Sequence, residues 1–562
     1  MRDSFATDPR HLKAFKDLQQ AVSCQRQGRL AEAEKLYARV TKKNPQYFDA
    51  LHLYGLFKYQ LGQFNDAARL VGSATKVNPR SANALNSLGV ILAHLKRHQE
   101  AIASFEAALR LEPNHVQALG NQSNSLNELG RFLEAIGCAD RALTIARDYA
   151  EAYIPRGAAL LGSNRYVEAL ESYDSALTIN PSLAIAWAGR GNSCHKLGRY
   201  GEAFAAFDKA IALKPDLADG WLGRGNVLFS HNRDPEALLC YDKAIALKQD
   251  LADGYFNKSL LKLSLGDYRE GWQLYEWRWK KHSFSSPVRN FGQPVWLGDG
   301  DLSNKTILIH SEQGFGDTIQ FYRYISLLEG LGCEIIFETQ AALVPLVNAQ
   351  GCNVQVIGQG SPLPKFDIHC PLLSLPLAFK TTLDAIPASI PYLVAAPEKQ
   401  RLWRAKLGEK SKPRIGLAWS GNLVPDFKRS IPLEHLLPIM SGDVEWHSLQ
   451  EEVRANDHRV LELNPEIVQH ARFLTDFSET AALITELDLV ISIDTAVAHL
   501  AGALGKPVWI LLPFHPDFRW LRDRQDSPWY PTARLFRQTK DGDWSDVLGK
   551  ISNELRALNI NV

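Results

Sequence analysis

Residues 184–217 read AIAWAGRGNSCHKLGRYGEAFAAFDKAIALKPDL, and residues 218–251 read ADGWLGRGNVLFSHNRDPEALLCYDKAIALKQDL. The two stretches align without a gap over 34 residues and share a glycine at 191 and 225, an alanine at 203 and 237 and an aromatic residue at 207 and 241. A unit of this length cannot bury its apolar faces alone. The pattern therefore predicts two short helices per unit, with neighbouring units stacked into a solenoid that has a concave groove.

The same period runs through the first half of the chain. Proline recurs near the end of five units, alanine stands twelve residues before the same point in all seven, and glycine recurs earlier in five. Proline stops a helix, whereas alanine and glycine let two helices cross closely. These residues are Pro45, Pro79, Pro113, Pro181 and Pro215; Ala33, Ala67, Ala101, Ala135, Ala169, Ala203 and Ala237; and Gly55, Gly89, Gly157, Gly191 and Gly225.

This pattern is identified as that of the tetratricopeptide-repeat family. We expect a superhelix over residues 14–283, preceded by a lead-in over 1–13. It consists of seven 34-residue repeats and a degenerate eighth repeat, Ala252–Lys281, in which Gly271 replaces the alanine and tryptophans crowd the second helix. We interpret the eighth repeat as a cap that docks onto the next domain.

Asparagines at one repeat position are candidates for binding in the groove. Asn124, Asn192 and Asn226 share the ninth position of the first helix of their units. Asparagine amides can pair with the backbone of an extended peptide whatever its sequence. The alternative is a polar surface with incidental spacing.

From about residue 291 the helical period gives way to short apolar runs that alternate with helical stretches, which indicates parallel sheets. We expect a linker over 284–301 and two α/β halves over 302–391 and 392–562, as in GT-B glycosyltransferases, with a hinge near the proline-marked stretch 386–400. The strand candidates are Thr306–His310, Glu334–Glu338, Val354–Ile357, Arg414–Trp419, Val444–Ser448, Asp488–Ile493 and Val508–Leu512.

Composition excludes several classes of protein. The 63 basic and 62 acidic residues give a net charge of +1, so nucleic-acid binding is not expected. Seven cysteines without a Cys-x-x-Cys pair indicate a reducing compartment and argue against a structural zinc site. The amino terminus lacks the apolar run of a signal peptide, and no apolar run is long enough for a membrane span. We therefore expect a cytoplasmic protein without membrane insertion.

Three segments carry the residues suited to chemistry. A glycine loop with Gly314, Gly316 and Asp317 follows the first strand, where backbone can approach a ligand. Asp317 is the candidate catalytic base, and the alternative is that it caps the next helix. Glu312 and His310 are alternative bases.

The second segment follows the strand candidate Arg414–Trp419. Ser420 and Asn422 lie in a polar loop, and Lys428 and Arg429 stand before the next helical stretch. Two cations there can neutralise a diphosphate, although a solvated surface pair is the common alternative.

The third segment joins the strand candidate Asp488–Ile493 to a helix. The N–H groups of Thr495 and Ala496 would face a bound anion. Asp494 would bind sugar hydroxyls or cap the helix, and His499 is a candidate phosphate or sugar contact.

GFGDTIQF (314–321) and DTAVAHLAGALGKP (494–507) together resemble the lipopolysaccharide heptosyltransferase family. The layout is similar to the O-linked N-acetylglucosamine transferases, whose groove carries an asparagine ladder, and to bacterial flagellin glycosyltransferases. The resemblance implies a metal-independent, inverting transfer from a nucleotide-sugar to a protein held by the repeats, with Asp317 as the base and Asp494 and His499 near the donor. The amino-terminal half looks short for this class, which bears on the acceptor site.

No metal or cofactor is expected beside the nucleotide-sugar, because Asp299 and Asp301, an Asp-x-Asp match, lie in a glycine-rich stretch typical of a turn. Two alternatives stay open: a protein-binding scaffold with an inactive transferase module, and transfer to a lipopolysaccharide or lipid-linked acceptor. A homodimer also stays open.

Overall fold

The computed structural model describes residues 9–281, 284, 286–351, 353–421, 428–440 and 443–557, with side chains from residue 12 on. It divides into two compact units, Met1–Val227 and Leu228–Val562. Among these described residues, no helix is long and apolar enough to cross a membrane.

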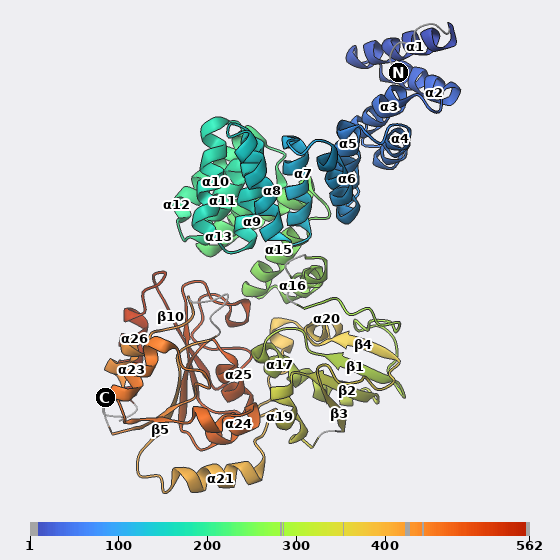
Figure 1. Ribbon diagram of the computed structural model, residues 1–562. Helices are drawn as coiled ribbons and strands as arrows, with labels where there is room; N and C mark the ends of the chain where they lie inside the picture. Colours follow the sequence, from blue (N-terminus) through green and yellow to red (C-terminus); the bar gives the residue numbers. More distant parts are fainter. Residues whose placement is uncertain are drawn as a thin grey trace. The chain divides into compact units, whose positions relative to one another are not determined.

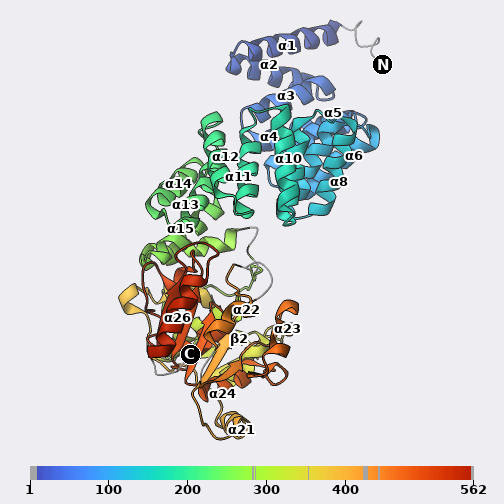
Figure 2. The same ribbon diagram turned by 90° about the vertical axis from the view of Figure 1, so that its left-hand side faces the viewer.

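The first unit is built from helices alone, arranged as successive antiparallel pairs (Figures 1 and 2). This confirms the predicted tetratricopeptide-repeat superhelix. The helices are α1 Pro9–Arg26, α2 Leu30–Lys43, α3 Phe48–Gln60, α4 Phe64–Val77, α5 Ala82–His94, α6 His98–Leu111, α7 Val116–Glu128, α8 Phe132–Ile145, α9 Ala150–Gly162, α10 Tyr166–Ile179, α11 Ala184–Lys196, α12 Tyr200–Leu213 and α13 Ala218–Ser230. The boundary between the two units falls within α13.

The small residues of the repeat lie where the helices cross. All seven of the recurrent alanines are fully buried. A Cβ added to Gly191 of α11 would lie 2.8 Å from the ring of Phe207 of α12, which is closer than side chains pack. Helices α8 and α14 end at the usual point although Arg147 and Gln249 stand where other repeats have proline, so proline is not required to end the helix.

A left-handed residue forms each turn between the two helices of a repeat. Its φ is positive in all eight units, a conformation that costs a non-glycine residue free energy. Glycine occupies five of these positions, asparagine two, and a lysine one: Gly28, Gly62, Lys96, Gly130, Asn164, Gly198, Asn232 and Gly266. The 34-residue period therefore applies to the turns as well as to the helices.

The second unit begins with the last repeats, α14 Asp234–Leu247, α15 Ala252–Ser264 and α16 Tyr268–Tyr275, followed by the 3-10 helix η1 Glu276–Lys280. The eighth repeat is degenerate as expected, since α16 has only eight residues. Trp272 of α16 is buried and packs edge-on against Phe321 and Phe518, with ring centroids 5.8 Å away in both cases. These contacts make α16 part of the α/β core.

The amino-terminal sheet has four parallel strands in the order β3-β2-β1-β4 (Figure 1). The strands are β1 Thr306–His310, β2 Glu334–Thr339, β3 Val354–Gly358 and β4 Ile368–Pro371. The helices between and after them are α17 Phe315–Phe321, η2 Tyr322–Tyr324, α18 Ile325–Glu329, η3 Ala341–Leu343, α19 Val344–Asn348, η4 Leu372–Ser374, α20 Leu375–Ala378 and η5 Leu383–Ala385.

The carboxy-terminal sheet has six parallel strands in the order β10-β9-β8-β5-β6-β7. The strands are β5 Arg414–Ala418, β6 Glu445–Ser448, β7 Ile467–Gln469, β8 Leu489–Ile493, β9 Val508–Leu512 and β10 Ala533–Arg537. The helices are α21 Pro397–Leu407, α22 Leu433–Leu436, η6 Leu437–Ile439, α23 Ala455–Leu463, η7 Ala471–Phe473, α24 Phe477–Thr485, α25 Ala496–Ala503, η8 Phe518–Trp520 and α26 Ser545–Ala557.

All seven predicted strands are present, with ends moved by one residue at most. Strands β4, β7 and β10 were not predicted. The stretch 386–400, predicted as a hinge, lies between the two sheets, but from Pro397 on it already belongs to α21. Two parallel sheets with helices between the strands confirm the expected α/β arrangement, which is consistent with a GT-B-like domain.

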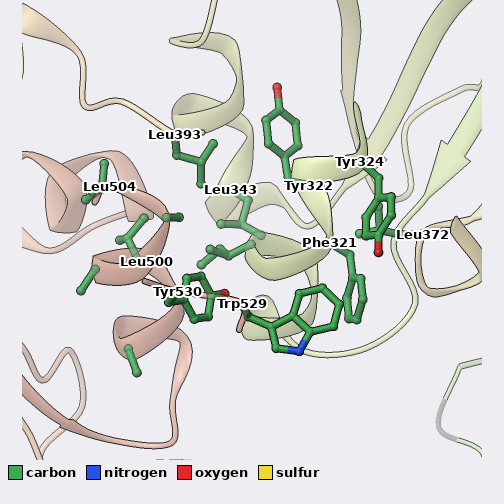
Figure 3. Packing of buried hydrophobic residues seen from close by; sticks show 14 of the residues in the cluster. Phe321, Tyr322, Tyr324, Leu343, Leu372, Leu393, Leu500, Leu504, Trp529 and Tyr530 are labelled. Atoms are coloured by element: carbon green, nitrogen blue, oxygen red, sulfur yellow. The ribbon is translucent and has the colours of Figure 1, made fainter. Parts of the chain in front are cut away.

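One buried apolar cluster joins the two halves of the α/β region to the last repeat. In Figure 3, Leu500 of α25 and Tyr530 lie across from Phe321 and Leu343 of the amino-terminal half, with Trp529 beside Phe321. Because the halves share one core, the loops at their facing edges are held at short distance from one another.

Those loops follow the strands at which the strand order of each sheet reverses. In the amino-terminal sheet the change lies between β1 and β4, and in the carboxy-terminal sheet between β5 and β8. Ligands of open parallel sheets bind at the carboxyl ends of such strand pairs. The glycine loop follows β1, Ser420 follows β5, and Asp494 follows β8.

Candidate functional site

Asp317 lies in the first turn of α17, directly after the glycine loop. Its Oδ2 accepts a hydrogen bond of 3.0 Å from the backbone N–H of Gly314, the residue that precedes the helix. This is the capping contact that the sequence offered as the alternative to catalysis. A carboxylate has about four acceptor positions, so the cap leaves Asp317 further capacity.

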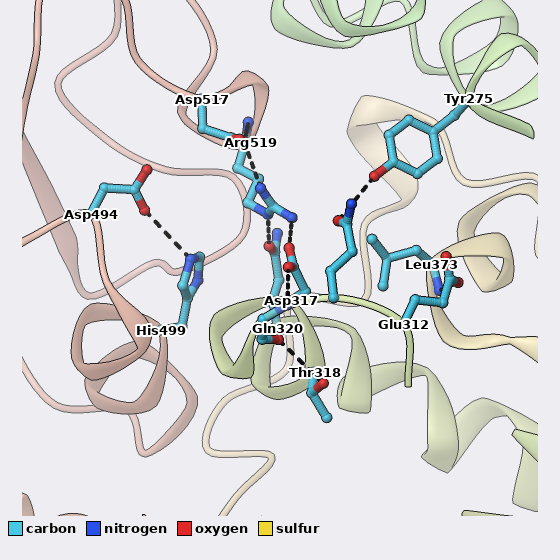
Figure 4. A network of polar contacts seen from close by, with 12 residues as sticks. Tyr275, Glu312, Asp317, Thr318, Gln320, Leu373, Asp494, His499, Asp517 and Arg519 are labelled. Carbon is cyan, nitrogen blue, oxygen red and sulfur yellow. Dashed lines mark hydrogen bonds and ion pairs between the residues drawn. The ribbon is translucent and has the colours of Figure 1, made fainter. Parts of the chain in front are cut away.

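The other carboxylate oxygen of Asp317 is paired with Arg519, which comes from η8 in the carboxy-terminal half (Figure 4). The Arg519 guanidinium also donates to the Gln320 side-chain oxygen and, over 2.7 Å, to Asp517 Oδ1. Burial lowers the pKa of Arg519, but the charges of Asp517 and Asp317 raise it by more, so the guanidinium stays charged.

Gly316 allows α17 to approach α25. A Cβ at residue 316 would lie 2.8 Å from His499 Cδ2 and 3.6 Å from Ala496 Cα. Carbon atoms pack best at about 3.5–4.0 Å, so only glycine fits here without movement. The glycine loop therefore brings Asp317 close to the residues of the third sequence segment.

Asp494 and His499 form a buried pair behind this contact. Asp494, at the end of β8, is 5% exposed, and its Oδ1 lies 3.7 Å from His499 Nε2. The other ring nitrogen of His499 is 2.9 Å from the Tyr530 hydroxyl, and the ring stacks on Trp520. Burial alone raises the pKa of Asp494, but the hydrogen bond from His499 and nearby positive charges bring it down to about 2.

The first residues of α25 are arranged differently from the expected capping. Thr495 is the N-cap residue, but its side chain makes no capping bond, and its hydroxyl lies 3.1 Å from Ser492 Oγ. The side chain of Asp494 contacts His499 and Arg429. Thr495 and Ala496 are half-buried at this end of the helix.

The two cations of the second segment are both engaged with carboxylates. Lys428 Nζ lies 3.1 Å from Asp541 Oδ2 in an exposed pair. Arg429 Nη1 lies 3.8 Å from Asp494 Oδ2 and donates to the Asp494 carbonyl over 3.4 Å. Arg429 thus joins the second segment to the third.

Gln450 holds Ser420 in place through hydrogen bonds. The Gln450 side-chain oxygen accepts hydrogen bonds from the N–H groups of Trp419 and Ser420, and its amide donates to Ser420 Oγ over 2.8 Å. Asn422, the remaining candidate of this segment, lies outside the described residues.

Sequence reasoning missed two arginines of this region. Arg454, which follows β6, donates to Ser430 Oγ over 2.6 Å and to the Gly421 carbonyl over 3.3 Å, so a third cation lies near the Lys428–Arg429 segment. Its signal was a cation shortly after a strand end. Arg519 also follows a strand end, that of β9, but the sequence could not show that its partner is Asp317, 202 residues away.

The two alternative bases have structural partners. Glu312 is buried in a two-pronged ion pair with Arg278 of η1, at 2.8 and 3.0 Å, and accepts the Leu373 N–H over 3.1 Å. His310 is buried 3.3 Å from His369, and burial followed by nearby positive charge lowers its pKa to about 3. Glu312 thus ties the last repeat to the amino-terminal half, whereas His310 pairs within that half.

The groove asparagines lie on α7, α11 and α13. Asn124 is exposed, whereas Asn192 and Asn226 are half-buried. A neighbouring position shows amide pairing between repeats, since Asn121 donates to Asn86 over 3.0 Å. Peptide binding by these residues stays a prediction.

Asp301 lies in a turn, as expected. Its carboxylate accepts the N–H of Ser303 over 3.0 Å and its hydroxyl over 2.7 Å, and Gly298 and Gly300 on either side of Asp299 have positive φ. Among the residues that the structure describes, no three His, Cys, Asp or Glu side chains form a group that could hold a metal ion.

Comparison with known proteins separates the chain into the same two parts. Tetratricopeptide-repeat models match residues 58–116, 100–152 and 121–184, and a TPR repeat model matches 191–232. The model of glycosyltransferase family 9 (heptosyltransferase) matches residues 462–515. That span contains Asp494 and His499 and stops before Asp517 and Arg519.

Protein FlbA of Caulobacter vibrioides is 26% identical over 331 residues, which are 54% of this chain and 54% of FlbA. The chain thus spans about half the length of this curated relative. A crystal structure of a tetratricopeptide repeat protein from Parabacteroides merdae is 18% identical, with a TM-score of 0.39, and the match covers 47% of this chain and 98% of that one. A thermophilic TPR protein of Thermus thermophilus is 24% identical, with a TM-score of 0.31, over 33% of this chain and 100% of that one.

The chain therefore carries tetratricopeptide repeats, and its carboxy-terminal part resembles the heptosyltransferases of glycosyltransferase family 9.

Proposed function

We propose that this chain is a glycosyltransferase that moves a sugar from a nucleotide-sugar to a hydroxyl group of a protein, without a metal ion and with inversion. One observation carries the proposal. Asp317 of one half and the Asp494–His499 pair of the other converge at the carboxyl ends of both sheets, where Gly316 lets α17 contact His499. The glycosyltransferase family model covers the second of these two parts.

The donor diphosphate would lie at the carboxyl end of the carboxy-terminal sheet. Lys428 and Arg429 would exchange their carboxylate partners for phosphate oxygens, and the N–H groups of Thr495 and Ala496 would add the positive end of α25. Ser420, fixed by Gln450, can donate its hydroxyl hydrogen. In this proposal the nucleotide-sugar is a co-substrate, and no further cofactor takes part.

Asp317 would act as the base. The acceptor oxygen forms a bond to the anomeric carbon while the bond from that carbon to the diphosphate oxygen breaks. The acceptor proton passes to the Asp317 carboxylate, and the nucleoside diphosphate leaves with the electron pair. Attack from the side opposite the leaving group inverts the anomeric centre.

The acceptor would be a protein or peptide segment held in the repeat groove, with Asn124, Asn192 and Asn226 pairing with its backbone. This assignment rests on the repeats, which generally mediate binding between proteins. A cytoplasmic location and a homodimer belong to the same proposal.

Nucleotide binding tests the donor site. The thermal midpoint of the full chain is measured with the mono- and diphosphates of uridine, guanosine, adenosine and cytidine. A ligand at about 100 times its dissociation constant adds about 2.7 kcal/mol, enough to raise the midpoint by several degrees. We expect one nucleotide to raise it in the wild type and the effect to be lost in Lys428→Ala/Arg429→Ala.

The matched control removes two cations from the opposite edge of the same half. Lys410 and Lys412 form exposed pairs with Asp488 and Asp443 before β5. The Lys410→Ala/Lys412→Ala variant should keep the full nucleotide effect. Equal losses in both double variants would refute the assignment of Lys428 and Arg429.

A second candidate is a protein-binding scaffold whose transferase module does not turn over. The observation that favours it is the pairing of the base and the cations within the protein: Asp317 with Arg519, Lys428 with Asp541 and Arg429 with Asp494. The absence of a midpoint change with every nucleotide would favour this candidate over catalysis.

A further inference from the structure

Arg519 is a buried cation that joins the two halves of the α/β region. It is 7% exposed and lies over the rings of Phe518 and Phe321, at 4.7 and 5.8 Å from their centroids. Each of its three guanidinium nitrogens donates a hydrogen bond. Nη2 meets Asp317, Nε meets Gln320 of the same helix α17, and Nη1 meets Asp517 of its own loop.

This planar group fixes α17 at two points. Asp317 and Gln320 are one helical turn apart, and the rigid fork of a guanidinium can hold both side chains at once. The Asp317 carboxylate is then held by Arg519 on one oxygen and by the Gly314 N–H on the other. Figure 4 shows Arg519 above Asp317 and Gln320, with the Asp494–His499 pair to one side.

The segment that carries Arg519 is anchored to the last repeats on its other side. Arg522 lies 3.3 Å from Asp234 at the start of α14, and both side chains are largely buried. The His515 ring packs edge-on against Phe229, with centroids 4.4 Å apart. Trp529 donates to the Tyr268 hydroxyl over 3.0 Å.

We propose that Arg519 is a positioning residue that holds Asp317 and α17 in place for the transfer reaction, and that the Arg522–Asp234 contact with the seventh repeat sets the position of Arg519. This inference rests on the proposed function for its link to catalysis. The segment 513–526 then connects the seventh repeat to the base, so that an acceptor that alters this repeat alters the base as well.

The first test follows hydrogen–deuterium exchange of the full chain and needs no substrate. We expect Arg519→Gln to speed exchange in residues 315–321, because α17 loses its two side-chain anchors. Asp234→Asn should speed exchange in 513–526 and, more weakly, in 315–321. The matched control is Arg524→Gln, which removes an exposed cation paired with Asp526 in the same segment and should leave 315–321 unchanged. Unchanged exchange of 315–321 in Arg519→Gln would overturn the proposal.

The second test uses turnover of the nucleotide-sugar whose nucleotide binds. Arg519→Gln should lower kcat by about 10- to 100-fold through misplacement of the base, while KM for the donor changes little.

Arg519→Lys should restore only part of kcat, since it keeps the charge but lacks the fork. An increase in donor KM as large as the loss in kcat would show that Arg519 contacts the donor instead, and would overturn its positioning role. If the wild type turns over no nucleotide-sugar, the proposed function fails, and the exchange experiment still decides whether Arg519 positions α17.

Discussion

The contact between Gly316 and His499 gives a prediction that depends on packing alone. In Gly316→Ala the new methyl group would lie 2.8 Å from His499 Cδ2, about 0.7 Å inside the roughly 3.5 Å at which carbon atoms begin to pack well. The His499 ring cannot easily yield. It is 4% exposed, bonded to the Tyr530 hydroxyl and stacked on Trp520.

The helices must therefore separate, and overpacking of this kind costs about 1–3 kcal/mol. In a domain of more than 200 residues each kcal/mol lowers the thermal midpoint by about 2 °C, so we expect a loss of about 2–6 °C in the transition of the second unit. Scanning calorimetry of the full chain measures it.

Gly314→Ala is the control, because a methyl group at residue 314 would have Asp317 Oδ2 as its nearest neighbour, at an ordinary 3.6 Å. It should cost about 0.5 kcal/mol, the difference between glycine and alanine before a helix. If Gly316→Ala melts together with Gly314→Ala, α17 and α25 are not in the close contact described here.

Two further predictions concern a turn and a buried charge. Lys96 has a φ of 61° where five other repeats have glycine. Lys96→Gly should therefore stabilise the repeats by about 0.5–1 kcal/mol, measured by urea unfolding. The control is Lys76→Gly in helix α4, which should destabilise them. Asp494 has its pKa lowered to about 2, so its ionised form stabilises the fold by about 2 kcal/mol above pH 4, and this is lost as pH falls toward 2. Asp494→Asn should lack this acid-dependent step; an unchanged step would contradict the assignment.

The repeats could be predicted because their determinants are local. The interval of 34, the buried alanines and the close crossings such as Gly191–Phe207 all involve neighbouring helices, and solenoid stability is a sum of such contacts. The left-handed turns follow the same register, although Lys96 shows that the turn tolerates a residue other than glycine or asparagine.

The sheet was less completely predictable. The clearest of the strands found from sequence are buried and almost wholly apolar, as in β8 and β9. The missed strands lack that signal for separate reasons. β4 has four residues, includes a histidine and ends in proline; β7 has three; and β10 has arginine at two of its five positions and lies at the edge of its sheet. Their pairing with longer neighbours, rather than their composition, makes them strands.

The candidate site was predictable where a motif follows a strand and unpredictable where a partner is distant. Asp317, Asp494 and His499 could be proposed from their place after strands. The role of Arg519 could not be predicted, because it depends on the side chains that Arg519 contacts. Those side chains come from α17 and from its own loop. The capping bond to Gly314 was foreseen as an alternative, yet the same carboxylate makes both contacts.

The positions of Arg429 and Asp494 explain how the Asp494 carboxylate could lie beside a donor diphosphate in the proposed complex. Asp494 is 5% exposed, whereas the Arg429 side chain is 38% exposed and lies 3.8 Å from it toward the surface. In the proposed complex an anion that reaches the carboxyl end of the sheet meets the cation before the carboxylate. When Arg429 turns toward the phosphate, the Asp494 carboxylate keeps a partner in His499, at 3.7 Å. The buried pair therefore lets Arg429 change partners without leaving the Asp494 carboxylate unpaired, which would be costly for a buried charge.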